Sequence, residues 1–176
     1  MHAFDRPVGA RLIALLAVST AFAFVVAAPA SAEQNQVSGV QTPGATGPPA
    51  CTDPSASFTM TGGLVGCWYE DSIMITKDQT TASGIELIHV SGTEHFIGCL
   101  DRDGDGSCIG ADPSGTLYFT FTFTEQVDVA TGSEIRGRCH HPIVGGTGDF
   151  AAATGVLNFK DDIPSGTSPY MGHLSF

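Results

Sequence analysis

A run of alternating aspartates is the part of this 176-residue chain whose residue types and spacing best suit metal chemistry. The stretch CLDRDGDGSCIGAD matches the calcium-loop pattern D-x-[DN]-x-[DN]-G-x5-E, with aspartate in place of the final glutamate. Calcium takes several oxygen ligands, and the glycine permits the sharp turn that brings a backbone carbonyl to the ion. The pattern predicts a structural calcium site with these ligands: Asp101, Asp103, Asp105, Ser107 and Asp112.

The same stretch is also compatible with a solvated turn that binds no ion. Aspartate at the last position reaches less far than glutamate, and no helical pattern flanks the loop on either side. Aspartate and glycine favour turns for their own backbone reasons. Both interpretations therefore stay open at the level of the sequence.

A second group of polar residues lies in the segment SEIRGRCHH, which has the alternation of a strand. Strand geometry places Arg136, Arg138 and His140 on one face together with Glu134. Inside a barrel, this face would bind the carboxylate of a fatty-acid-like ligand. On the outside, the arginines would pair with surface acids. His140 and His141 point to opposite faces, so they cannot share one metal ion.

Motifs of the common hydrolases and nucleotide-binding proteins are absent from the chain. There is no GxSxG elbow, no HExxH pair and no phosphate-binding loop. His89, Glu94 and His95 form only a weak cluster, which we interpret as surface residues. The sequence thus assigns no catalytic residue and leaves enzymatic activity open.

The chain contains five cysteines, and none of them forms a CxxC pair. Exported cysteines oxidise, so two disulfides and one remaining thiol are expected. Cys99 and Cys108 bracket the aspartate run and form the first predicted pair, with Cys51–Cys67 second.

The first 32 residues have the pattern of a secretory signal peptide. Two arginines precede an apolar run that ends in Ala30-Ser31-Ala32, which predicts cleavage after Ala32 and a secreted product. Cleavage leaves 17 acidic and 5 basic residues, a net charge of −12. Such a surface repels phosphate backbones and anionic membranes, so we expect neither nucleic acid nor membrane as a partner.

The rest of the chain divides into a leader, residues 33–55, and an all-β domain, residues 56–176. The leader is rich in Pro, Gly, Ser and Thr and has few large apolar side chains, which predicts flexibility. The domain alternates apolar and polar residues in short runs separated by turn residues. Strands are predicted at 57–62, 64–70, 72–77, 85–90, 95–100, 117–127, 133–141, 155–160 and 170–176.

The segment HPIVGGTGDFAAATGVLNFKDD, residues 141–162, resembles one shared by allene oxide cyclases and dirigent-like proteins. The matching positions are Gly145, Gly146, Thr147, Gly148, Phe150, Ala153 and Gly155. The resemblance extends over about residues 92–176 and implies an eight-stranded antiparallel β-barrel with a cavity. Its glycines permit close backbone approach, and Phe150 with its alanines fits a turn packed over a barrel end.

Two functional hypotheses follow from this fold. A barrel of about eight strands either holds one small apolar ligand or fills with its own side chains as a structural extracellular domain. The resemblance implies the alternative, a cofactor-free cyclase or isomerase for an unsaturated fatty-acid-like or secondary-metabolite substrate. Apart from calcium, no cofactor is expected, and the oligomeric state is open.

Overall fold

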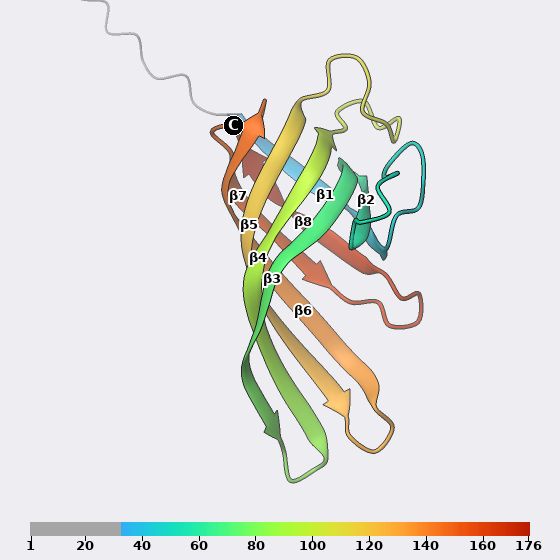
Figure 1. The fold of residues 1–176 in the computed structure, drawn as a ribbon, viewed down its shortest axis with the longest axis vertical. Helices are drawn as coiled ribbons and strands as arrows, with labels where there is room; N and C mark the ends of the chain where they lie inside the picture. Colours follow the sequence, from blue (N-terminus) through green and yellow to red (C-terminus); the bar gives the residue numbers. More distant parts are fainter. Residues whose placement is uncertain (1–32) are drawn as a thin grey trace, which may run out of the picture. The chain divides into compact units, whose positions relative to one another are not determined.

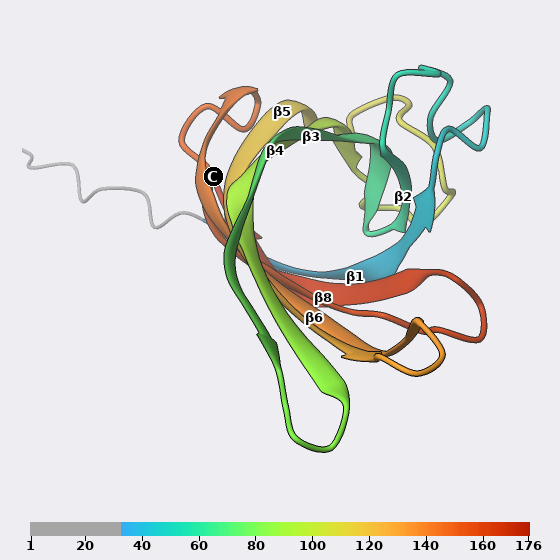
Figure 2. The same ribbon diagram turned by 60° about the horizontal axis from the view of Figure 1, so that its bottom comes forward.

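Eight strands follow one another around a closed antiparallel sheet in the computed structural model, which describes residues 33–176 (Figures 1 and 2). Each strand pairs with the next along the chain, and β8 pairs with β1 to close the ring. The strands are β1 (Gln34–Pro43), β2 (Phe58–Gly62), β3 (Leu64–Thr80), β4 (Ile85–Leu100), β5 (Ser114–Asp128), β6 (Ser133–Gly148), β7 (Thr154–Lys160) and β8 (Ser168–Ser175). The prediction of an all-β fold with eight antiparallel strands is confirmed.

The predicted strand segments are longer and fewer in the structure. The segments 64–70 and 72–77 are parts of β3, and 85–90 and 95–100 are parts of β4. The pairing register of β3 with β4 shifts between Glu70 and Ser72, which leaves Asp71 as a β-bulge. The break that the sequence suggests between 64–70 and 72–77 is therefore a β-bulge, and β3 continues through it.

The prediction of a flexible leader over residues 33–55 is wrong for its first half. Gln34–Pro43 forms β1, which is hydrogen-bonded to β2 on one side and to β8 on the other. Val37 and Gln41 point inward and are buried. The segment is ordered despite its few apolar side chains because ring closure supplies backbone hydrogen bonds on both of its sides. The predicted signal peptide, residues 1–32, lies outside the described residues.

A packed core fills one end of the ring. On β5, Leu117 and Phe119 are buried whereas Tyr118 and Thr120 are exposed, as the alternation predicts. Fully buried Trp68 stacks on Phe119 at a centroid distance of 4.6 Å. The other members of this core include Met60, Leu64, Phe96, Leu157 and Leu174.

Tyr170 ties β8 to the tight connection between β2 and β3. Its side chain is buried, and its hydroxyl accepts a hydrogen bond from the Leu64 amide at 2.8 Å and donates to the Thr61 carbonyl at 3.2 Å. The turn after β6 covers the same end of the ring, because Phe150 is fully buried and packs edge-on against Phe176. Phe150 therefore lies in a turn that packs over one end of the ring.

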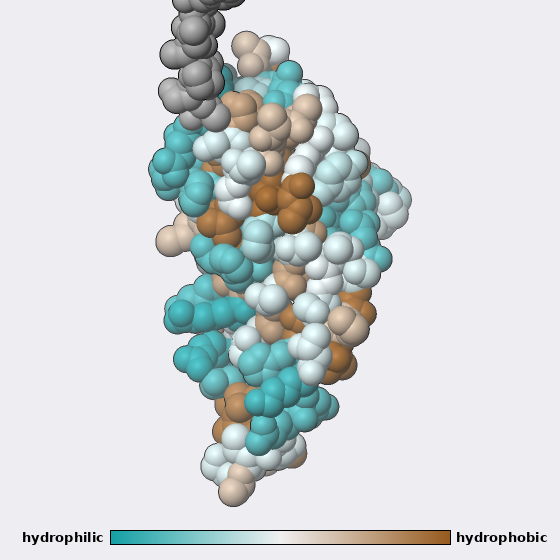
Figure 3. Space-filling view, turned by 90° about the vertical axis from the view of Figure 1, so that its left-hand side faces the viewer, coloured by the Kyte–Doolittle hydropathy of each residue, from teal (hydrophilic) through white to brown (hydrophobic). Residues whose placement is uncertain are grey.

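The β3–β4 hairpin extends well beyond the part of the sheet where β2 pairs with β3 (Figures 1 and 2). Ile73, Met74 and Ile75 on this extension are exposed. On the face drawn in Figure 3, apolar side chains form separate patches between polar ones.

Both predicted disulfides, Cys99–Cys108 and Cys51–Cys67, are present. Cys139 is the free cysteine, as expected from the count of five. Disulfides are consistent with an extracellular protein. Within residues 33–176, no helix is long and apolar enough to cross a membrane.

Candidate functional site

A cavity of about 470 Å³ lies beyond the packed core, with buried residues such as Glu94 and Phe121 in its inner wall and exposed residues such as Ile73 at its rim. All eight strands contribute side chains to its wall. Along β5 the inward residues pass from the core, at Phe119, to the cavity wall, at Phe121 and Phe123. On β7, Leu157 lies in the core, and Phe159 belongs to the core and also lines the cavity. The ring is therefore filled at one end and hollow at the other.

The apolar part of the wall is mainly aromatic. Four phenylalanines line the cavity, namely Phe58, Phe121, Phe123 and Phe159, and Ile73 and Val90 join them. A wall of this kind, in a volume of this size, is typical of sites for small organic molecules.

The polar part of the wall is acidic. Five carboxyl side chains line the cavity, namely Glu70, Glu94, Glu134, Asp161 and Asp162. No lysine or arginine is among the lining residues in the described part of the chain. Partial burial, followed by the charge of Glu94, raises the pKa of Glu70. The cavity is thus electronegative as well as aromatic.

Glu94 and His141 form a buried pair at the boundary between core and cavity. They are 6% and 4% exposed, and Glu94 Oε2 lies 2.7 Å from His141 Nε2. The contact is an ion pair when the imidazole is protonated, but it does not have the geometry of a hydrogen bond. Glu94 Oε2 and, on the other side of the ring, His141 Nδ1 are buried without a hydrogen-bond partner. The imidazole packs against Phe159 at 4.6 Å and against Trp68 at 5.4 Å. An unpartnered carboxylate oxygen at a cavity wall can accept a hydrogen bond from a ligand.

Cys139 lies beside this pair but is not an activated nucleophile. Its Sγ is 3.4 Å from His141 Nε2, the same nitrogen that meets Glu94. A nucleophilic triad needs the acid and the nucleophile on different ring nitrogens. Burial, followed by the charges of Glu94 and Asp161, raises the pKa of the Cys139 thiol, so the thiol stays protonated.

Glu134 and Asp161 form a second acidic pair at the cavity. Burial, followed by a hydrogen bond with Asp161 and the charge of that residue, raises the pKa of Glu134 to about 7. Ser168 Oγ donates a hydrogen bond to Asp161 Oδ1 at 2.6 Å. A Cβ atom at Gly137 would collide with Asp161 Oδ2, so glycine there leaves room for the pair.

Arg136, Arg138 and His140 are exposed on the outer face of β6, so of the two alternatives left open by the sequence the outward one describes this face, and the interior ligand site at these residues is wrong. His140 Nδ1 lies 2.8 Å from Asn158 Oδ1 on the neighbouring strand. Glu134 does not share a face with the two arginines, although strand alternation predicts that it does. The β5–β6 register shifts between Gln126 and Val127, which gives β6 one extra residue at this point. This bulge turns Glu134 inward while the arginines stay outside.

His141 points inward and His140 outward, as strand alternation predicts. The interpretation of Glu94 as a surface residue, together with His89 and His95, is wrong for Glu94, which is buried. A usable signal exists: in the segment EHFIGCL, Glu94 has the same parity as Phe96 and Leu100, both of which are in the core. A carboxylate in phase with core residues indicates a buried polar position.

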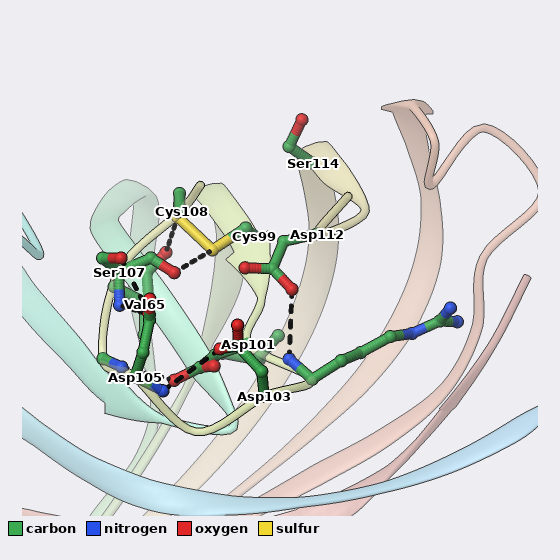
Figure 4. The surroundings of a disulfide bond; sticks show 12 residues. Val65, Cys99, Asp101, Asp103, Asp105, Ser107, Cys108, Asp112 and Ser114 are labelled. Carbon is green, nitrogen blue, oxygen red and sulfur yellow. Dashed lines mark hydrogen bonds between the residues drawn. A yellow bond between two sulfur atoms is a disulfide. The ribbon is translucent and has the colours of Figure 1, made fainter. Parts of the chain in front are cut away.

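The aspartate loop lies at the other end of β4, outside the ring, and the Cys99–Cys108 disulfide joins its two sides (Figure 4). One oxygen each of Asp101, Asp103 and Asp105 lies within 4.8 Å of the others. Asp101 accepts hydrogen bonds from the amides of Gly104 and Gly106, at 2.7 and 2.8 Å. The Gly106 bond, above all, lowers the pKa of Asp101.

The two other predicted calcium ligands are Asp112 and Ser107, the latter through its backbone carbonyl. The Ser107 hydroxyl donates a hydrogen bond to Asp105 Oδ1 at 2.7 Å. Asp112 Oδ1 accepts a hydrogen bond from the Arg102 amide at 3.2 Å, and its Oδ2 is buried without a partner. The loop thus brings the carboxylates of Asp101, Asp103 and Asp105 together, and Asp112 lies outside this group.

Comparison with protein-family models, with curated proteins and with solved structures gives no match for this chain. The resemblance to allene oxide cyclases gains no support from these comparisons and stays a prediction that rests on the Gly145–Gly155 motif.

The pKa of Glu134 predicts how stability depends on pH. Because folding raises this pKa from 4.5 to about 7, the unfolded state binds fewer protons between these values and stability falls as pH rises. Glu134→Gln removes this loss. We expect a higher melting temperature than the wild type at pH 8 and little difference at pH 4, measured by circular dichroism.

Glu33→Gln is the matched control, since it removes a single charge from an exposed side chain. It should give no comparable gain at pH 8. A Glu134→Gln melting curve that matches the wild type at both pH values would contradict the assigned coupling to Asp161.

Proposed function

We propose that this protein is a secreted binding protein that holds one small, largely apolar molecule inside its ring of strands. The observation that carries the proposal is the cavity of about 470 Å³ whose wall includes four phenylalanines. Pockets of roughly 300–1,000 Å³ with aromatic walls and a few polar groups are the usual sites of small ligands. A purely structural domain has no need for a hollow end next to a well-packed one.

Two features support a location outside the cell. The two disulfides fit an oxidising compartment, and the N-terminal sequence has the pattern of a signal peptide. The acidic composition suits a soluble secreted protein.

Filling the cavity tests the proposal. Val90 lines the cavity, so Val90→Trp should occupy the space of the ligand and weaken the binding of a neutral apolar dye, Nile red, by at least about tenfold. Dye fluorescence measures the binding, and circular dichroism shows whether the variant folds.

Val144→Trp is the control, because it places the same side chain on the outer face of β6, where Val144 is 60% exposed. This variant should bind the dye as the wild type does. Equal dye binding by all three proteins, or none by the wild type, would exclude the cavity as a ligand site.

A cofactor-free cyclase or isomerase is the alternative proposal, with a fatty-acid-like or secondary-metabolite substrate. The specific observation in its favour is the buried Glu94–His141 pair at the cavity, since a carboxylate and an imidazole can exchange protons with a bound molecule. The similarity of the Gly145–Gly155 motif to allene oxide cyclases also supports it. The acidic wall disfavours a substrate carboxylate deep in the cavity.

We further propose that the aspartate loop binds one structural calcium ion. The converging oxygens of Asp101, Asp103 and Asp105 support this. The positive φ of Gly106, 78°, is the left-handed conformation that the calcium-loop turn requires.

Replacing two of the aspartates tests the calcium proposal. Calcium at about a hundred times its dissociation constant should stabilise the wild type by about 2–3 kcal/mol, and Asp103→Ala with Asp105→Ala should abolish this gain. Thermal unfolding with and without calcium measures it. Asp78→Ala with Glu86→Ala, which removes two acids from the β3–β4 hairpin, should keep the gain. A calcium response that survives in the loop variant would exclude the site.

A further inference from the structure

We infer that the ligand of the cavity is a small organic cation, an apolar body that carries one ammonium group. This inference rests on the proposed binding function and assigns the chemical class of the ligand. Three features of the wall carry it: its excess of carboxyl groups, a buried carboxylate oxygen without a hydrogen-bond partner, and its aromatic surface.

The charge of the wall selects the sign of the ligand. Five carboxyl side chains line the cavity, and the lining residues in the described part of the chain include no lysine or arginine; His141, beside Glu94, is the one basic side chain among them, so the carboxyl groups remain in excess. Charges of one sign in a cavity with low-dielectric walls produce a focused potential. A cation is attracted into this potential, whereas a carboxylate or phosphate is repelled.

Glu94 is the residue that would bind the ammonium group directly. Its side chain is 6% exposed, it lines the cavity, and its Oε2 has no hydrogen-bond partner. His141 Nε2 lies 2.7 Å away and forms an ion pair with Glu94 when the imidazole is protonated, but it makes no hydrogen bond to Oε2, which keeps its capacity to accept one. A buried carboxylate oxygen left in this state is costly, and an N–H donor from a ligand would satisfy it with a charge-assisted hydrogen bond.

The aromatic side chains complete the site for an amphiphilic cation. Phe121 stacks on His141 at a centroid distance of 5.7 Å, so its ring lies close to the Glu94–His141 pair. Aromatic faces attract cations and also bury alkyl or ring carbons. Phe58 and Phe123 extend the apolar surface, so an ammonium near Glu94 leaves room for an apolar body.

A matched series of probes separates charge from apolarity. Octylammonium, octanol and octanoate share an alkyl chain and differ in the charge of the head group. Displacement of Nile red at pH 8 reports their binding to the full secreted chain. We expect octylammonium to bind at least about tenfold more tightly than octanol, and octanoate to bind more weakly than octanol.

Two variants test whether the preference for octylammonium over octanol comes from the carboxyl groups of the cavity wall. Glu94→Gln should reduce the affinity for octylammonium at least about tenfold while leaving the affinity for octanol unchanged. Glu134→Gln removes a different carboxyl group and should reduce the same preference more weakly; it keeps the test valid if Glu94→Gln folds poorly. Glu33→Gln, an exposed charge removal next to Arg102, should change neither affinity.

The outcomes distinguish the inference from the function on which it rests. Octanol or octanoate binding as tightly as octylammonium would overturn the cationic ligand and leave the binding function standing. Failure of all three probes and of the dye would overturn both. Octylammonium binding that persists in Val90→Trp would show attraction to the acidic outer surface only, and this too would overturn the inference.

Discussion

Closure of the sheet through β1 is the constraint on which the rest of the structure depends. β1 is hydrogen-bonded to β2 and to β8, so it removes both free edges that a sheet from β2 to β8 would leave. Once the ring is closed, every strand has one face that can only be interior. Which side chains meet inside then follows from strand parity and from the β-bulges that reset this parity.

The interior is divided along its axis by side-chain size and polarity. Around Trp68, large apolar side chains from neighbouring strands fill the ring, and the Phe150 turn covers that end. Further along the same strands, inward positions carry carboxyl groups beside phenylalanines. Carboxylates repel one another and resist dehydration, so they do not collapse into a packed core. The hollow end follows from the residues that face it, and it is the basis for the binding function and cationic ligand that we propose.

Most of the fold can be predicted from the sequence. The alternation of β5 predicts its buried face correctly, and the cysteine positions predict both disulfides. β1 could not be predicted, because its stability comes from pairing with β2 and with β8, which is far away in the chain, and not from its own side chains. The inward turn of Glu134 depends on a bulge that local alternation does not reveal.

The candidate site was harder to predict than the fold. Arg136 and Arg138 drew attention because their charge suits ligand binding, yet they lie outside. Glu94 has the parity of its core neighbour Phe96, but its significance appears only when ring closure brings it to His141 on β6. Glu94 on β4 and His141 on β6 are brought together by the β4–β5 and β5–β6 pairings, so their contact depends on the register of both pairs. Register is the property that a single sequence specifies least directly.

The central claim is that the ring is hollow beyond its core and that this space receives a cationic ligand. A crystal structure of residues 33–176 grown with octylammonium tests it most directly. The account predicts the probe inside the ring, with its nitrogen within hydrogen-bond distance of Glu94 and its chain against Phe121 and Phe123. A cavity closed by inward movement of these phenylalanines, or a probe bound only on the outer face, would contradict it.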